Sequence, residues 1–135
     1  MVQLGALMQY LLDTHVLIWW ITSDKRLSQK AHSMIMSHRN TLFWSVVSTW
    51  EISIKHSLGR LVFEEPPEDL LPFELEKNRL ETLLIMNEHA FRVGQLPQHH
   101  KDPFDRMLVA QAQIESIGII SNDQKLRQYD VDVLW

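Results

Sequence analysis

The sequence predicts an α/β fold in which helices cover both faces of a parallel sheet. Short apolar runs of about four to six residues alternate with helical patterns along the whole chain, and this alternation is typical of parallel strands joined by crossover helices. The 135 residues can bury one core but are too few for two ordinary domains. We therefore expect a single domain over residues 8–135, preceded by a short extension or tail over residues 1–7.

The composition is that of a soluble globular protein, with 45% hydrophobic and 22% charged residues. The absence of cysteine excludes disulfides and thiolate zinc sites, and it favours the cytoplasm. No apolar run approaches the roughly 20 residues that span a bilayer, so we expect no membrane contact. The net charge of −4 argues against a generally basic nucleic-acid-binding protein, unless several acids are gathered in one place and neutralised by metal.

Apolar patterns in the first half of the chain predict two strands and three helices. Residues 9–13 (QYLLD) form a short apolar strand that ends in an acid, and an apolar helix follows over residues 15–21. A second helix is expected over residues 28–38, beginning near Ser28. The second strand, residues 41–45 (TLFWS), passes at once into a helix over residues 46–59.

The helix over residues 46–59 predicts an apolar stripe, because four apolar residues recur at helical spacing: Val47, Trp50, Ile54 and Leu58. Gly59, the last residue of this stretch, is expected at the C′ position, directly after the helical turns end. Glu51 borders the stripe, and the common interpretation of such a residue is a solvated glutamate.

The second half predicts three more strands. The Pro-rich and acid-rich residues 64–78 are expected to form a loop and a short helix. Asn87 is expected to cap a short helix over residues 87–95, and a longer helix runs from Asp102 to about Ser116. The strands are residues 79–86, 118–121 and 131–135, with a turn and a short helix over residues 122–129 between the last two.

Acidic residues follow two of the strands directly. Asp13 comes after the first strand and Asp123 after the fourth. Each has a structural interpretation, Asp13 as a helix N-cap and Asp123 as a turn or cap residue. In the stretch DPFD, Asp102 suits the N-cap position, and Asp105 suits the first turn because acids interact favourably with the helix dipole there. None of these acids needs a catalytic role when taken alone.

Taken together, the acids favour a metal site. Parallel strands end at one edge of a sheet, so four carboxylates are expected to converge there: Asp13, Glu51, Asp105 and Asp123. They would repel one another without a cation, and all-oxygen ligation suits Mg²⁺ or Mn²⁺. The chain has 17 acidic residues and 13 Lys and Arg, so the excess of four acids equals the size of the proposed site. Such a site could activate water for in-line attack on a phosphate.

Four stretches carry a family resemblance: YLLDTHVLIWW, SVVSTWEISIKHSLGRL, HHKDPFDRMLVAQA and IISND. In this order and spacing, the chain from Met8 to Trp135 resembles PIN-domain ribonucleases, and in particular the VapC-like toxins of bacterial type II toxin–antitoxin pairs. The resemblance implies a PIN-like α/β/α sandwich with a five-stranded parallel sheet. It also implies a divalent-metal-dependent endoribonuclease that cleaves RNA with metal-activated water, forms a homodimer and is blocked by a small antitoxin protein.

The resemblance assigns catalytic and metal-binding roles to the acidic quartet, Asp13, Glu51, Asp105 and Asp123. Asp102 corresponds to the first Asp of the DPFD motif, and we interpret it as a helix cap or supporting residue rather than a ligand. Thr14 and Ser121 flank the acids and would orient ligands or a water molecule. Arg106 could contact phosphate or pair with an acid such as Asp102.

Other residues have competing interpretations. His99 and His100 could suggest a transition-metal site, but a solvated loop or a substrate contact is simpler because the chain has no Cys and no helical His pair. Lys55 and Arg60 could belong to an RNA track or to a solvated helix face. Four tryptophans favour core or dimer contacts over base stacking: Trp19, Trp20, Trp44 and Trp50.

Rival functions leave different patterns. A nucleophilic-Asp phosphatase would carry a second acid two residues after Asp13, where this chain has His15. A receiver domain would carry adjacent acids near the first strand and a Lys after the last strand of the pocket, and the chain has neither. A non-catalytic PIN-fold interaction module and a solitary nuclease without an antitoxin stay open.

Overall fold

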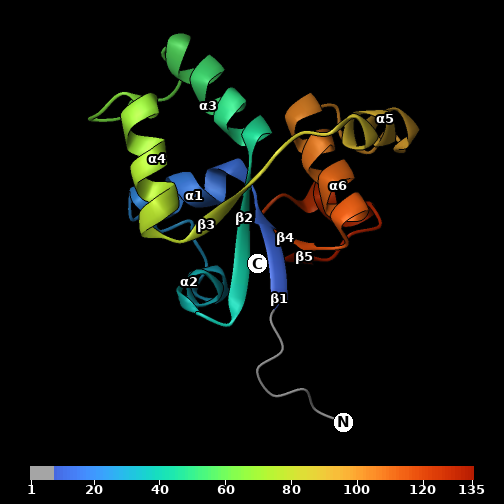
Figure 1. The fold of residues 1–135 in the computed structure, drawn as a ribbon, viewed down its shortest axis with the longest axis horizontal. Coiled ribbons are helices and arrows are strands. Elements are labelled where there is room, and N and C mark those ends of the chain that lie inside the picture. Colours follow the sequence, from blue (N-terminus) through green and yellow to red (C-terminus); the bar gives the residue numbers. More distant parts are fainter. Residues whose placement is uncertain (1–7) are drawn as a thin grey trace.

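Five parallel strands form one sheet in the computed structural model, which describes residues 8–135 (Figure 1). The order across the sheet is β3-β2-β1-β4-β5, so β1 is central. The predicted tail over residues 1–7 lies outside the described residues. The strands are β1 (Met8–Leu12), β2 (Asn40–Ser45), β3 (Leu80–Leu83), β4 (Gly118–Ile120) and β5 (Val133–Leu134).

Helices cover both faces of this sheet (Figure 1). On one face lie α1 (Thr14–Ile21), α2 (Gln29–Met36) and α4 (Pro67–Lys77), while α3 (Val46–Ser57) follows the end of β2 and contributes to the cores on both sides. On the other lie α5 (Asn87–Gln95) and α6 (Pro103–Glu115), and the short 3₁₀ helix η1 (Gln124–Gln128) joins β4 to β5. The predicted α/β/α sandwich with five parallel strands is thereby confirmed. The chain winds from β1 outward to β3 and then crosses to β4, which makes the β1–β4 boundary the switch point where such folds bind ligands.

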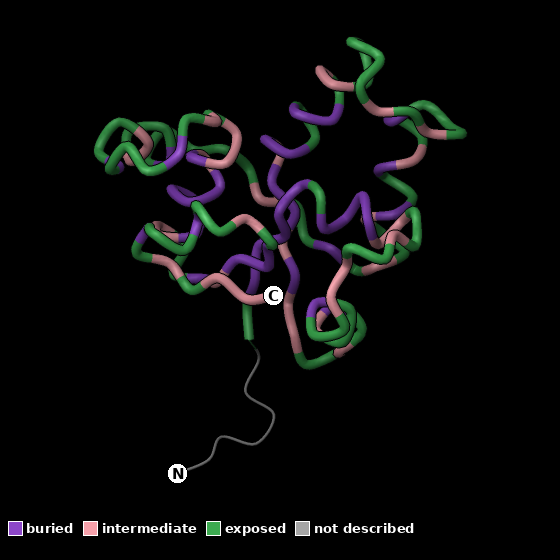
Figure 2. The backbone as a smooth tube through the Cα atoms, turned by 180° about the vertical axis from the view of Figure 1, so that it is seen from behind, coloured by how far each residue is buried: buried purple, intermediate pink, exposed green. Residues whose placement is uncertain are grey.

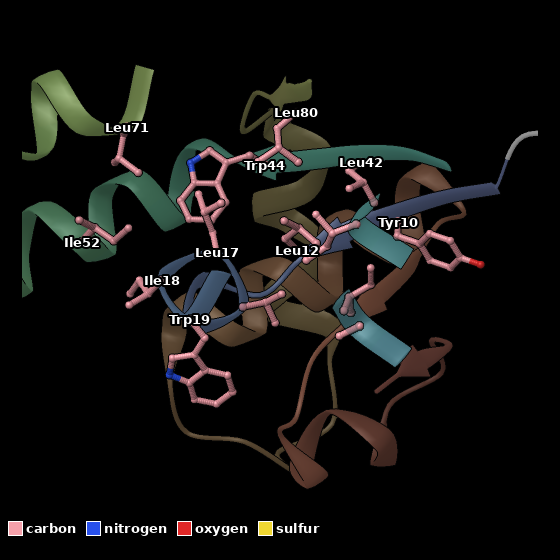
Figure 3. Packing of buried hydrophobic residues seen from close by; sticks show 14 residues of the cluster. Tyr10, Leu12, Leu17, Ile18, Trp19, Leu42, Trp44, Ile52, Leu71 and Leu80 are labelled. Carbon is pink, nitrogen blue, oxygen red and sulfur yellow. The ribbon is translucent and has the colours of Figure 1, made fainter. Parts of the chain in front are cut away.

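Alternate residues of β1 face two separate cores. Tyr10 and Leu12 point into a core shared with α1, α2 and α4, in which Trp44 is fully buried (Figure 3). Leu11 points into the second core, beside Leu108 of α6. The continuous apolar run of β1 follows from this burial on both sides. Packing from two sides holds the carboxyl end of β1 in place, and the next residue is Asp13.

Local signals in the sequence set several helix ends. The side chain of Ser28 accepts a hydrogen bond from the N–H of Ala31 and caps α2, as predicted. Gly59 follows α3 with a φ of +73°, the left-handed conformation that favours glycine. The predicted cap of α5 is wrong by one residue. Met86 is the N-cap, because the ring of His89 accepts its N–H and thereby starts the helix one position earlier.

The later elements differ in length from the prediction. β3 ends at Leu83, so residues 84–86 of the predicted strand form an irregular link to α5. β5 has only two residues. The acid-rich segment is mostly helical, since α4 runs for 11 residues from Pro67 and proline suits the first turn. None of the helices within residues 8–135 is both long enough and apolar enough to cross a membrane.

The predicted apolar stripe of α3 is wrong. Val47 is buried, but Trp50 and Leu58 are 57% and 61% exposed. The face that packs inward carries Glu51 and Ile52 instead. The reason is geometric: α3 begins immediately after β2, capped by the Ser45 side chain, so the strand sets the rotation of the helix. Figure 2 shows its buried positions gathered near its start, with exposed positions toward its end.

Candidate active site

The ends of β1 and β4 lie side by side and carry the first part of the site. β1 and β4 are paired in parallel, with Leu12 opposite Ile120. The next residue on β1 is Asp13, and the next on β4 is Ser121, whose hydroxyl donates a hydrogen bond of 2.6 Å to Asp13 Oδ2. This bond joins two positions 108 residues apart in the sequence. Ser121 thus orients an acid, which is the role expected of it.

Asp13 is buried, and its side chain does not cap α1. It occupies the N-cap position, yet its carboxylate accepts no hydrogen bond from the helix. Its Oδ1 atom has no hydrogen-bond partner among the described residues. Burial raises the pKa of Asp13; the Ser121 hydrogen bond and the charge of His15 oppose the shift, and the charges of Glu51 and Asp123 add to it. A buried carboxylate oxygen left without a donor is costly in a folded protein, which favours a role in binding.

Glu51 is buried in the same way, which contradicts its interpretation as a solvated glutamate. The residue is 2% exposed. Its Oε2 atom lies 2.5 Å from Lys55 Nζ, one turn along α3, while its Oε1 atom has no hydrogen-bond partner among the described residues. Lys55 therefore forms an ion pair with Glu51 of the acidic quartet. This contact replaces both predictions for Lys55, a place in an RNA track and a place on a solvated helix face.

The DPFD stretch starts α6 as predicted. Asp102 is the N-cap, and its Oδ1 atom accepts hydrogen bonds from the backbone N–H groups of Phe104 and Asp105, at 2.8 and 3.2 Å. Asp105 in the first turn has a side chain that is only 15% exposed. Burial raises the pKa of Asp105 to about 8, with further contributions from neighbouring charges: Asp13, Asp102, Glu51 and Asp123. These mutual effects place all four members of the acidic quartet in one electrostatic cluster.

His100 belongs to this cluster and was not predicted to. The residue is buried, and its Nε2 atom lies 2.8 Å from Asp123 Oδ2 and 3.1 Å from Asp105 Oδ2. Asp123 also caps η1 through Oδ1, which accepts the Lys125 N–H, so its capping and clustering roles coexist. The available signal was position, because His100 stands two residues before the helix cap Asp102. Neither a solvated loop nor an exposed substrate contact describes His100.

A pocket of about 300 Å³ opens over the acids. Its lining includes the acids Asp13, Asp105 and Asp123 together with Trp19 and Arg26. The Arg26 guanidinium lies 4.9 Å above the Trp19 ring and pairs with Asp24 at 2.8 Å. The same pocket thus contains a cation and an aromatic surface as well as the acids.

Two predicted residues have structural contacts instead. Thr14 donates a hydrogen bond of 2.7 Å to Ser48, which joins α1 to α3 rather than orienting an acid. Arg106 is buried, and its guanidinium donates to the carbonyl oxygens of Pro97 and Val93, both at 2.9 Å, and to the Tyr129 hydroxyl. Among the described residues, its guanidinium makes no ion pair with Asp102. These contacts favour a structural role for Arg106 over a phosphate contact.

The quartet fits a hard divalent cation. Carboxylate oxygens are the ligands that Mg²⁺ and Mn²⁺ prefer, and two such oxygens, one on Asp13 and one on Glu51, are buried without a partner among the described residues. Two groups of three residues have ligand-type atoms within 4.8 Å of one another: His100, Asp105 and Asp123 at this site, and Glu88, His89 and Glu115 elsewhere. There, however, both ring nitrogens of His89 are engaged in starting α5 and binding Glu115.

Comparison with known proteins decides the family. The sequence profile described as PIN domain matches residues 10–132, which is nearly the whole chain. The chain belongs to the PIN domain family. This confirms the predicted family, and the PIN domain so defined contains every member of the acidic quartet together with His100.

One relative and two solved structures are similar to this chain over most of its length. Ribonuclease VapC22 of Mycobacterium tuberculosis is 29% identical over 120 residues, covering 88% of this chain and 90% of the relative. The structure of VapBC2 from Rickettsia felis, bound to a DNA fragment from its promoter, matches with a TM-score of 0.70 at 17% identity, over 94% of this chain and 98% of that one. A toxin–antitoxin complex from Klebsiella pneumoniae matches with a TM-score of 0.63 at 19% identity, over 93% and 96%. The two structural matches confirm the PIN-type fold.

Proposed function

We propose that this protein is a divalent-metal-dependent endoribonuclease and the toxin of a type II toxin–antitoxin pair. The observation that carries the proposal is the cluster at the strand ends, where Asp13 and Glu51 each hold one buried carboxylate oxygen without a partner among the described residues. The similarity to Ribonuclease VapC22 supports RNA as the substrate. We also propose that residues 8–135 form one catalytic domain.

Mg²⁺, or Mn²⁺ in its place, is the cofactor we propose for the acidic quartet. When bound, such a cation lowers the pKa of water and offsets the negative charge on the scissile phosphate. The chain supplies the orientation. Ser121 holds Asp13 Oδ2, and Lys55 holds Glu51 Oε2, so that the second oxygen of each carboxylate stays available. Asp102 starts α6 and thereby places Asp105, and the carboxylates orient the attacking water by accepting its hydrogen bonds.

The exposed side of the pocket suits a polyanion. Arg26 lines the same pocket as the acids, and a guanidinium can pair with a phosphate while its flat face stacks on a base. This contact offsets, at the site itself, part of the repulsion that a chain of net charge −4 exerts on RNA.

The decisive experiment compares the wild-type protein with Asp13→Asn on structured RNAs, each with Mg²⁺ and with excess EDTA. Cleavage is expected only for the wild type in Mg²⁺, because Asn keeps the size of the side chain but removes the charge that holds the cation. The loss should exceed the roughly 10–100-fold that results from removing a residue that only supports a metal ligand. Asp69→Asn, the same exchange at an exposed acid in the first turn of α4, serves as the control and should cleave normally. Cleavage that persists in Asp13→Asn or in EDTA would refute the proposal.

We propose a small antitoxin protein and a second copy of the chain as partners. Large apolar side chains are exposed along α3, α4 and the link after β3, including Leu58, Phe73 and Leu84, and such exposure is typical of interaction surfaces. An apolar groove of about 330 Å³ lies between α3 and α4. The Klebsiella pneumoniae neighbour, a toxin–antitoxin complex, supports an antitoxin partner. Since the proposed substrate is cellular RNA, we place the protein in the cytoplasm.

The partner proposal predicts that a short reading frame next to this gene encodes a DNA-binding protein. Co-expression of that protein should abolish RNA cleavage and yield a stable complex on gel filtration. Light scattering should give twice the chain mass of 15.9 kDa for the isolated protein. The absence of such a frame would favour a solitary ribonuclease, and a monomeric mass would contradict the homodimer.

A further inference from the structure

The ring of His100 is held by contacts at both of its nitrogens. The residue precedes α6 and is 8% exposed. Its Nδ1 atom accepts a hydrogen bond of 3.1 Å from the backbone N–H of Asp102. Its Nε2 atom faces the carboxylates of Asp123 and Asp105, at 2.8 and 3.1 Å. Its own backbone N–H donates to the hydroxyl of Tyr129, so the position of the ring is fixed from three sides.

These contacts determine which nitrogen carries the proton. A backbone N–H can only donate, so Nδ1 of His100 must offer its lone pair to Asp102. A neutral imidazole with a lone pair on Nδ1 has its hydrogen on Nε2. The atom that faces the two carboxylates is therefore an N–H donor. It has no lone pair with which to bind a cation, which excludes His100 as a metal ligand in this arrangement.

We infer that His100 is a positioning residue for the acidic quartet. Its Nε2–H donates to Asp123 Oδ2 and lies close to Asp105 Oδ2, so that one N–H group holds these two acidic side chains side by side. The free oxygens of Asp13 and Glu51 are left to the cation. This inference deepens the proposed function, since it assigns a role within the same site.

His89 provides a matched control within the same chain. Its Nδ1 atom accepts the Met86 N–H at 3.0 Å, and its Nε2 atom lies 2.9 Å from Glu115 Oε2. The pair of contacts is thus the same as at His100. Glu115 lies at the opposite end of α6 from Asp105, about 15 Å along a helix that rises 1.5 Å per residue. His89 therefore reports what this arrangement contributes to stability alone.

Two substitutions separate the functions of the two ring nitrogens. His100→Gln keeps an N–H donor at the place of Nε2 but loses the acceptor at Nδ1. His100→Asn keeps an acceptor at the place of Nδ1 but loses the donor that faces the carboxylates. Mn²⁺ affinity, measured by isothermal titration calorimetry, is expected to fall by about 10–100-fold in His100→Asn and to be largely retained in His100→Gln. His89→Asn should lower the melting temperature without changing Mn²⁺ affinity.

A second measurement uses the folded wild type and does not depend on any variant. Side-chain ¹⁵N NMR should show the Nε2–H tautomer for His100, both without metal and with saturating Mg²⁺ or Zn²⁺. Loss of the Nε2 proton on metal binding would overturn the inference, because it would make His100 a ligand. Unchanged Mn²⁺ affinity in His100→Asn, or equal losses in both His100 variants, would also overturn it. If these results are as expected but the wild type cleaves no RNA, the inference stands and the proposed function fails.

Discussion

Asparagine in place of Asp105 is expected to abolish RNA cleavage and to stabilise the metal-free protein at the same time. Burial and four neighbouring acids raise the pKa of Asp105 to about 8, so its charge is unfavourable in the fold without a cation. Asn keeps the shape and removes this penalty. We expect a gain of about 2 kcal/mol or more in the free energy of unfolding near pH 8, because each pKa unit corresponds to about 1.4 kcal/mol. Cleavage should fall by more than about 100-fold, as for loss of a metal ligand.

The measurement combines urea unfolding in EDTA with RNA cleavage in Mg²⁺. Asp69→Asn is the matched control, since Asp69 is an exposed acid in the first turn of α4. It should lose only about 0.3–1 kcal/mol of stability, from the helix dipole, and cleave normally. If Asp105→Asn behaves like Asp69→Asn in both assays, Asp105 is only a first-turn charge and its assignment to the metal site is wrong.

The free energy of unfolding of the metal-free protein is expected to fall as pH rises from about 4 to about 8. The unfolded chain loses the Asp105 proton near the ordinary aspartate pKa of 3.8, whereas the folded protein keeps it until about pH 8. Through this window the folded state binds one more proton, so raising the pH favours unfolding by up to about 1.4 kcal/mol per pH unit. The raised pKa of Asp13 acts in the same direction.

An opposing group acts at a different pH. The Arg26 contact lowers the pKa of Asp24 to about 2, so its contribution to stability is present above about pH 4 and disappears only toward pH 2. Urea unfolding in EDTA at pH 5 to 8 avoids the Asp24 effect, and Asp105→Asn should reduce the slope, leaving the contribution of Asp13. Saturating Mg²⁺ should flatten it in the wild type, because metal binding displaces the proton. A stability that rises with pH in EDTA would contradict the electrostatic account of the site.

The acids at the strand ends could be located from the sequence because their positions depend on local pattern. Asp13 follows an apolar run, which predicts the end of a strand, and Asp102 precedes a proline, which predicts the start of a helix. The burial of Glu51 could not be predicted in this way. The apolar spacing of α3 predicts that Trp50 is buried. In the structure Glu51 is buried instead, because α3 follows β2 directly and the strand sets the rotation of the helix. Apolar spacing identifies a helix but does not determine which face meets the sheet when both faces carry apolar residues.

The order of strands and helices along the chain, the parallel sheet and the acids at its edge could all be predicted from local patterns, because periodicity and capping act over a few neighbouring residues. The burial of individual acids, the contacts of Arg106 with backbone carbonyls and the place of His100 beside the acidic quartet became known from the folded structure. These outcomes depend on contacts such as Ser121 with Asp13, 108 positions apart. The tautomer of His100 depends in the same way on which donor and which acceptors the fold brings to its two nitrogens.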